Sequence, residues 1–137
     1  MLVQLDWPRA FGDQLDRLDE KAKSGDKQAK LVKELVDAQL KFLNDELFEP
    51  PSRDEESKIL RWVRQSKKNQ VWRVSHEYNP GAAVRTIVWF PADNQAVILL
   101  FYGNKLHMGD IFYDTVGDRA DHLITQYLKE IEGDKNA

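Results

Sequence analysis

The sequence predicts an α+β fold in which an N-terminal strand and an α-helical hairpin precede an antiparallel three-stranded meander and a C-terminal helix. Apolar residues follow helical spacing in residues 8–48 and 116–131, and they alternate with period two in residues 1–7 and in much of 71–102. The chain has 137 residues, 42% of them hydrophobic and 31% charged, which excludes a disordered or fibrous class. This length predicts a single domain over residues 1–137.

The N-terminal part predicts a short half-buried strand followed by two antiparallel helices. Residues 1–7 alternate apolar and polar side chains, and residues 8–48 show two runs of helical spacing. Gly25 is expected to end the first helix, and Asp6 and Asp26 are expected to cap the first and second helices. Because only about three residues separate the helices, they should pack as a hairpin.

The second half of the chain predicts the sheet. Residues 49–70 are expected to connect the hairpin to the meander, and within them residues 57–68 fit a helical turn and a strand equally well. Residues 96–102 are apolar throughout, as in a central strand that is covered on both faces. Residues 103–109 are expected to form a loop before the final helix.

Positive charge is concentrated in one segment of an acidic chain. The net charge is −3, yet residues 58–76 contain six basic residues and no acidic residue. Such a run is either a solvated surface or a contact for a polyanion. The six basic residues are Lys58, Arg61, Arg64, Lys67, Lys68 and Arg73.

Several classes of function are excluded by what the sequence lacks. Because the chain has no cysteine, disulfide scaffolds, cysteine zinc sites and thiol catalysis are excluded. It contains no glycine-rich phosphate loop, metalloprotease motif or serine hydrolase motif, so neither a metal nor a cofactor is expected. The first nine residues do not resemble a signal peptide, and the longest apolar run is too short to cross a membrane. A cytoplasmic location is therefore expected.

The candidate functional residues lie on the predicted meander and just after it. Arginine and lysine can bind phosphate, while histidine and tyrosine can transfer protons in metal-free phosphodiester chemistry. Alternation places Arg73 and Ser75 on one face of their strand and His76 on the other. A structural interpretation stays open, in which Arg85 pairs with Glu77, His107 is an exposed loop residue and Tyr113 with Phe112 plugs the core. The candidates are Arg73, His76, Arg85, Lys105, His107 and Tyr113.

In these segments the chain resembles the RelE/ParE superfamily of bacterial toxins. The order of elements matches, and the similar segments are residues 60–64, 71–74, 83–90, 97–101 and 103–105, with Phe112 and Tyr113. The resemblance implies that Arg85 binds the scissile phosphate. It also implies that Arg73 is a basic residue of the second strand, that Lys105 belongs to a basic loop and that Tyr113 is the C-terminal tyrosine.

The resemblance predicts a metal-independent endoribonuclease that acts on ribosome-bound mRNA and is neutralised by a cognate antitoxin. The expected catalytic residues are Arg85, Lys105, His107 and Tyr113, and the expected RNA-binding residues are Arg61, Arg64, Lys67, Lys68, Arg73 and His76. Because the isoelectric point is near 5.6, a non-catalytic binding module with the RelE fold is an alternative. A ParE-like inhibitor of DNA gyrase is another.

Overall fold

The computed structural model describes residues 3–45, 60–63, 69, 71–75, 84–92, 94–103 and 105–135, with the side chains of residues 103–115 and 134–135 outside the description. Three helices and five strands form in these residues. In chain order they are β1 (Gln4–Asp6), α1 (Arg9–Lys23), α2 (Lys27–Asp45), β2 (Leu60–Trp62), β3 (Val71–Ser75), β4 (Val84–Ala92), β5 (Gln95–Gly103) and α3 (Lys105–Lys135).

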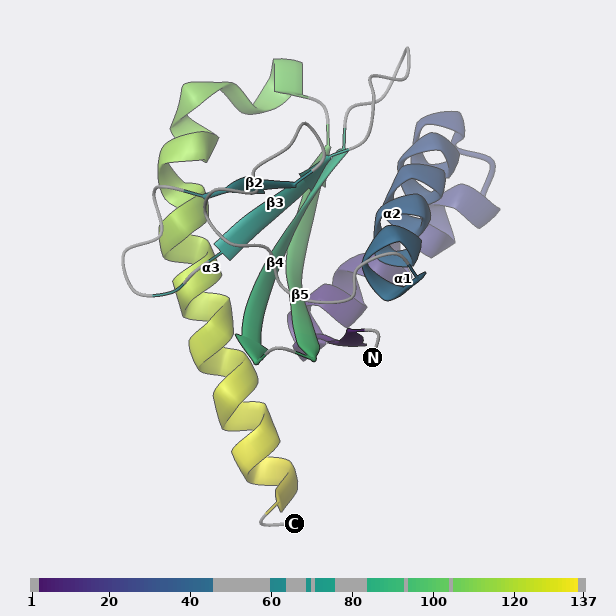
Figure 1. The fold of residues 1–137 in the computed structure, drawn as a ribbon. Helices are drawn as coiled ribbons and strands as arrows, with labels where there is room; N and C mark the ends of the chain where they lie inside the picture. The colour runs from purple at the N-terminus through teal and green to yellow at the C-terminus, as the bar shows by residue number, and fades with distance from the viewer. Residues whose placement is uncertain are drawn as a thin grey trace.

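The five strands form one mixed sheet with the order β1-β5-β4-β3-β2 (Figure 1). Strand β1 pairs with β5 in parallel, and all other neighbours are antiparallel. The α+β class is therefore correct, but the sheet has five strands and is not limited to the predicted three-stranded meander. Strand β2 lies inside the predicted connector, and its three residues pair with β3 in a fixed register.

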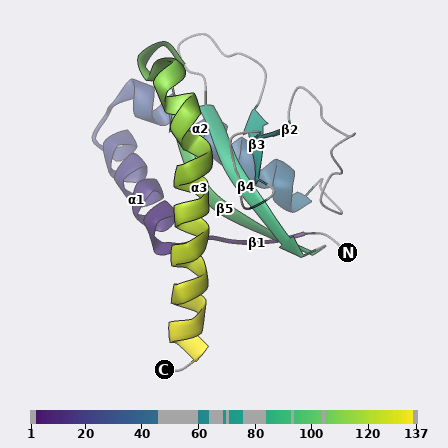
Figure 2. The ribbon, with the colours of Figure 1, turned by 90° about the vertical axis from the view of Figure 1, so that its left-hand side faces the viewer.

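Helices α1 and α2 cover one face of the sheet, and α3 crosses the other (Figures 1 and 2). Each face carries its own apolar cluster, one with Phe11, Val36 and Leu43 of the hairpin and the other with Ala120 and Ile124 of α3. All residues from 96 to 102 are at most 8% exposed, which confirms the expectation that this strand is covered on both faces.

The turn between α1 and α2 follows the predicted chemistry. Gly25 has a φ of 100°, and its N–H donates to the carbonyl oxygen of Ala22, while the N–H of Asp26 donates to that of Lys21. The Asp26 carboxylate accepts a hydrogen bond from Ala29 N at 3.0 Å, so Asp26 caps α2 as predicted.

The predicted cap at Asp6 was wrong. Pro8 occupies the N-cap position of α1, with no side-chain hydrogen bond to the helix. Asp6 is still part of β1, where it pairs with Val97, and its carboxylate accepts a hydrogen bond from the N–H of Trp7 instead.

Helix α3 begins eleven residues earlier than the sequence predicted, at Lys105 rather than residue 116. The segment predicted to be a loop is bounded by Gly103 and Gly109, and glycine is typical of loops. A single glycine costs only about 1 kcal/mol inside a helix, and a long helix that packs on a sheet can offset that cost. Lys105, His107 and Tyr113 are therefore residues of a helix and not of a loop or its border.

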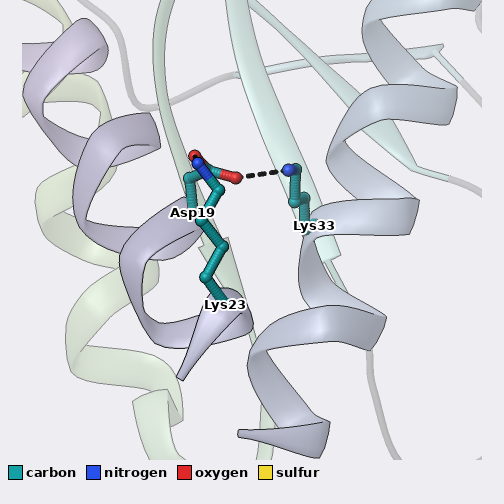
Figure 3. A network of polar contacts seen from close by, with 3 residues as sticks. All are labelled: Asp19, Lys23 and Lys33. Carbon is teal, nitrogen blue, oxygen red and sulfur yellow. Dashed lines mark hydrogen bonds and ion pairs between the residues drawn. The ribbon is translucent and has the colours of Figure 1, made fainter. Parts of the chain in front are cut away.

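One ion pair, between Asp19 and Lys33, joins α1 to α2 on the surface of the hairpin (Figure 3). Asp19 of α1 accepts a hydrogen bond from Lys33 of α2 and lies 3.0 Å from the ammonium group of Lys23. The hydrogen bond from Lys33, followed by that from Lys23, lowers the pKa of the Asp19 carboxyl. The same contact raises the pKa of Lys33.

Asp19→Asn is expected to make the stability of the hairpin less sensitive to acid. Because the pKa of Asp19 is lower in the folded chain, its contribution is present above the unfolded value and is lost as pH falls through the folded value. The difference in unfolding free energy between wild type and variant should therefore shrink from pH 7 toward pH 3 in urea titrations. Asp16→Asn, which removes the same charge from an exposed site of α1, is the control. Parallel pH curves for wild type and Asp19→Asn would contradict the assignment.

Candidate nucleic-acid interface

Three arginines lie on the face of the sheet that α3 crosses. Arg61 of β2 is directly opposite Arg73 of β3, and Arg73 is opposite Ile87 of β4. Ile87 belongs to the apolar cluster beneath α3, which identifies the face. Arg85 lies two residues before Ile87 on the same strand, so its side chain is on the same face.

Two hydroxyl side chains accompany Arg85 in the neighbouring strands. Ser75 of β3 is opposite Arg85, and Arg85 is opposite Tyr102 of β5. These two residues and the three arginines form one contiguous group, which we call the polar corner: Arg61, Arg73, Ser75, Arg85 and Tyr102. Farther along the same face the sheet is apolar, with Val71, Ile87, Trp89, Val97 and Leu99.

Exposure in the polar corner falls from the edge of the sheet toward its centre. Arg61 is exposed, while Arg73, Ser75 and Arg85 are half-buried. Tyr102 is only 5% exposed, and its hydroxyl oxygen and the Nε of Arg73 are buried. Arg73 and Arg85 are therefore less screened by salt than Arg61.

The charges of the polar corner favour an anion. Like charges directly opposite each other in a sheet, such as Arg61 and Arg73, are destabilising. Arginine offers paired donors that match phosphate oxygens.

The structure brings together part of the predicted site. Arg61, Arg73 and Arg85 share a face, and the prediction that Arg73 and Ser75 do so is confirmed. The backbone of α3 places Lys105, His107 and Tyr113 in its first three turns, where side chains are outside the description. Four other candidates lie outside the described residues, as does Glu77: Arg64, Lys67, Lys68 and His76.

The sequence did not single out Ser75 and Tyr102 as members of the site. Tyr102 is the last residue of an apolar run, which indicated only a core strand. The available signal was the period-two alternation of each strand, but that alternation does not reveal which residues stand opposite each other.

A second polar group ties α3 to the opposite end of the sheet. The hydroxyl of Tyr127 donates to the Asp6 carboxylate at 2.7 Å and accepts a hydrogen bond from the Gln95 amide at 3.1 Å. Glu130 accepts a hydrogen bond from the backbone N–H of Arg9. Burial, followed by the hydrogen bond to Asp6, raises the pKa of Tyr127 well above its usual range. These hydrogen bonds of Tyr127 and Glu130 fix α3 against the rest of the fold.

Tyr127→Phe is expected to lower stability by about 1–2 kcal/mol at neutral pH, because it removes these hydrogen bonds. The pKa of Tyr127 is higher in the folded chain, so its contribution is present below about pH 10 and is lost as pH rises further. The stability difference between wild type and variant should therefore shrink above pH 10 in urea titrations. Asp6→Asn keeps an acceptor without the charge and should give an intermediate result. An alkaline profile that Tyr127→Phe leaves unchanged would refute this account.

Comparisons with family models, curated proteins and solved structures found no match for this chain. None of the helices in the described part of the chain is long and apolar enough to cross a membrane. Within the same residues, no group of three or more His, Cys, Asp or Glu side chains could hold a metal ion.

Proposed function

We propose that this protein binds the phosphate backbone of RNA at the polar corner and acts as a RelE-like, metal-independent endoribonuclease on ribosome-bound mRNA. The observation that carries the proposal is the convergence of Arg61, Arg73 and Arg85 on one face of three adjacent strands. Three guanidinium groups in this arrangement provide both the charge and the paired donors for consecutive phosphates.

The arrangement of the elements supports the RelE-like part of the proposal. A strand and a helical hairpin come first, the hairpin covers one face of the consecutive antiparallel strands β3, β4 and β5, and a C-terminal helix covers the other face. This is the order of elements that the resemblance to the RelE/ParE superfamily predicts.

The chemistry that the proposal requires is an internal displacement at phosphorus. The 2′-oxygen attacks the phosphorus as a base removes its proton, the bond to the 5′-oxygen breaks, and an acid protonates the leaving oxygen. The products are a 2′,3′-cyclic phosphate and a 5′-hydroxyl. Arg85 and Lys105 would stabilise the charge that builds up on the phosphate oxygens, and His107 or Tyr113 would transfer the protons.

Induction of the gene in a bacterium, followed by mapping of cut sites on translated messages, tests the proposal. We expect growth arrest and cuts within translated frames, and both should disappear in Arg85→Ala. Arg119→Ala removes an exposed arginine from α3 and is the matched control, which should cut like wild type. Normal growth with intact messages would refute the toxin function.

One observation favours a non-catalytic RNA-binding module as the second candidate. Lys105 and His107 belong to the first turn of α3 and not to the basic loop that the resemblance implies. Binding of RNA without any cleavage would support this candidate. A DNA-damage response without message cleavage would instead support inhibition of gyrase.

The proposed partner is an antitoxin with an acidic or amphipathic segment that covers the polar corner. Co-expression with the product of a neighbouring gene should give a complex that no longer binds RNA. A complex that retains full RNA affinity would place the antitoxin elsewhere.

A further inference from the structure

We infer that a polar pocket beside Tyr127 binds a guanidinium group, with the Asp6 carboxylate as its anionic ligand and neighbouring carboxamide oxygens as further acceptors. The pocket and the polar corner are at opposite ends of the sheet, because Gln95 and Tyr102 lie near opposite ends of β5. The inference therefore concerns a second site, for a cation, and it does not depend on the proposed function.

The pocket opens where β1 meets the start of β5 and has a volume of about 330 Å³. The residues that line it are Gln4, Leu5, Asp6, Asn94 and Gln95. All of them except Leu5 have polar side chains, and Asp6 is the only charged residue in this described group. Small-molecule sites of about 300–1,000 Å³ are usually lined mainly by apolar groups. The polar lining here favours a small hydrophilic group over an apolar ligand.

The pairing of β1 with β5 gathers these polar side chains on one face of the sheet. Gln4 is paired with Gln95, and Asp6 lies two residues after Gln4, so all three side chains are on the same face. Tyr127 of α3 forms hydrogen bonds with Asp6 and Gln95, which identifies the face as the one that α3 crosses.

A buried tyrosine holds two of the lining groups in place. Tyr127 is only 3% exposed, and its hydroxyl donates to the Asp6 carboxylate and accepts from the Gln95 amide nitrogen. The N–H of Trp7 donates to the other oxygen of Asp6. An ionised carboxylate has about four acceptor sites, so both oxygens can still accept from a ligand. Because these groups are held before binding, little ordering cost remains.

The acceptors of the pocket suit a planar cation. Within the described part of the chain, no hydrogen bond engages the side chains of Gln4 and Asn94. The Gln95 amide bonds Tyr127 through its nitrogen, so its oxygen can accept from a ligand. The charge of Asp6 favours a cation. A guanidinium group has five N–H donors in one plane and is less strongly hydrated than an ammonium group, so it matches a carboxylate with several acceptors around it.

Titration with acetylarginine amide, followed through the side-chain amide signals of Asn94 and Gln95 in NMR spectra, tests the site. The citrulline analogue has nearly the same shape and no charge, and it is the matched control. We expect only the arginine compound to shift these signals. Asp6→Asn should weaken its binding about tenfold, as for the loss of one hydrogen bond to a charged group. Asp16→Asn, which removes an exposed acid of α1 outside the pocket, should bind like wild type.

Two further variants separate binding from folding. Asn94→Ala removes one acceptor but keeps the backbone carbonyl that bonds Gln4, so a folded variant should bind more weakly. Tyr127→Phe should also weaken binding, but much less in an Asp6→Asn background, because Tyr127 acts as a positioning residue for the carboxylate. An equal loss in both backgrounds would overturn that role.

The remaining outcomes decide the site and the source of its ligand. Equal shifts with the arginine and citrulline compounds would overturn recognition of a cation, and no shift with either would overturn the site. Methylguanidinium that binds as tightly as acetylarginine amide would support a free small molecule. A tripeptide with a central arginine that binds more tightly than both would support an arginine side chain of a partner protein. A protein that does not bind RNA can still give these results, because the pocket is separate from the polar corner.

Discussion

Replacement of Arg73 and Arg85 together by glutamine is expected to lower the affinity for a single-stranded oligoribonucleotide by roughly a hundredfold. A hydrogen bond to a charged group contributes about 1.5 kcal/mol at least, which is about tenfold in affinity for each arginine. Both side chains are half-buried, so their charges are less screened than those on an open surface. Glutamine keeps most of the stem and a donor but removes the charge. Fluorescence anisotropy with a labelled oligoribonucleotide measures the change.

The salt dependence of binding distinguishes phosphate contacts from a general loss of structure. For single strands, the slope of log affinity against log salt falls by about 0.7 for each phosphate contact that is lost, so the double variant should lose roughly 1.4. Arg61→Gln at the exposed edge should change the association rate more than the affinity. Arg119→Gln on α3 is the control and should keep the wild-type slope. A double variant with unchanged affinity and slope would place the RNA site elsewhere.

Regular patterns made much of the fold predictable. The two helices of the hairpin and the buried strand at residues 96–102 follow from apolar spacing alone, and Gly25 and Asp26 act at the turn as their backbone chemistry requires. Strand β2 was not predictable in this way. Its three residues fit both periodicities, and it is a strand because Leu60 and Trp62 find partners in β3.

The site was less predictable than the fold, because it depends on register. Alternation placed Arg73 and Ser75 on one face, but nothing in the sequence shows that Ser75 stands opposite Arg85 and that Arg85 stands opposite Tyr102. A slip of one residue between two strands would move the whole set of side chains to the other face. Glycine residues near Lys105 did not predict the start of α3, because packing of a long helix can offset the cost of a single glycine.

Gln39→Leu is expected to destabilise the fold by about 2–5 kcal/mol, which is a large part of the stability of a typical domain. Gln39 of α2 is fully buried against β4. Its amide donates to the carbonyl oxygen of Val84 at 2.8 Å and accepts a hydrogen bond from the hydroxyl of Thr86 at 2.5 Å. Leucine fills a similar volume, but it leaves the Val84 carbonyl and the Thr86 hydroxyl buried without their hydrogen bonds to Gln39. Urea unfolding followed by circular dichroism measures the loss.

A double-mutant cycle with Thr86→Val tests whether the two side chains form one unit. Thr86→Val alone leaves the Gln39 oxygen without its donor, whereas the double variant removes both partners and leaves only the Val84 carbonyl unsatisfied. The double variant should therefore be more stable than the sum of the two single losses predicts, by about 1 kcal/mol or more. Strict additivity would show that the two residues are independent.

The hydrogen-bonded pair of Gln39 and Thr86 also affects the polar corner, which lies on the opposite face of the sheet. Val84 and Thr86 flank Arg85 on β4, so their hydrogen bonds to Gln39 hold the backbone from which the Arg85 side chain projects. Gln39→Leu should therefore weaken RNA binding at temperatures where the variant is still folded, although Gln39 lies beneath the other face. Leu128→Ala shortens an exposed side chain on α3 and should leave the affinity unchanged. If folded Gln39→Leu protein binds RNA like wild type, the backbone of β4 is held by its neighbouring strands alone.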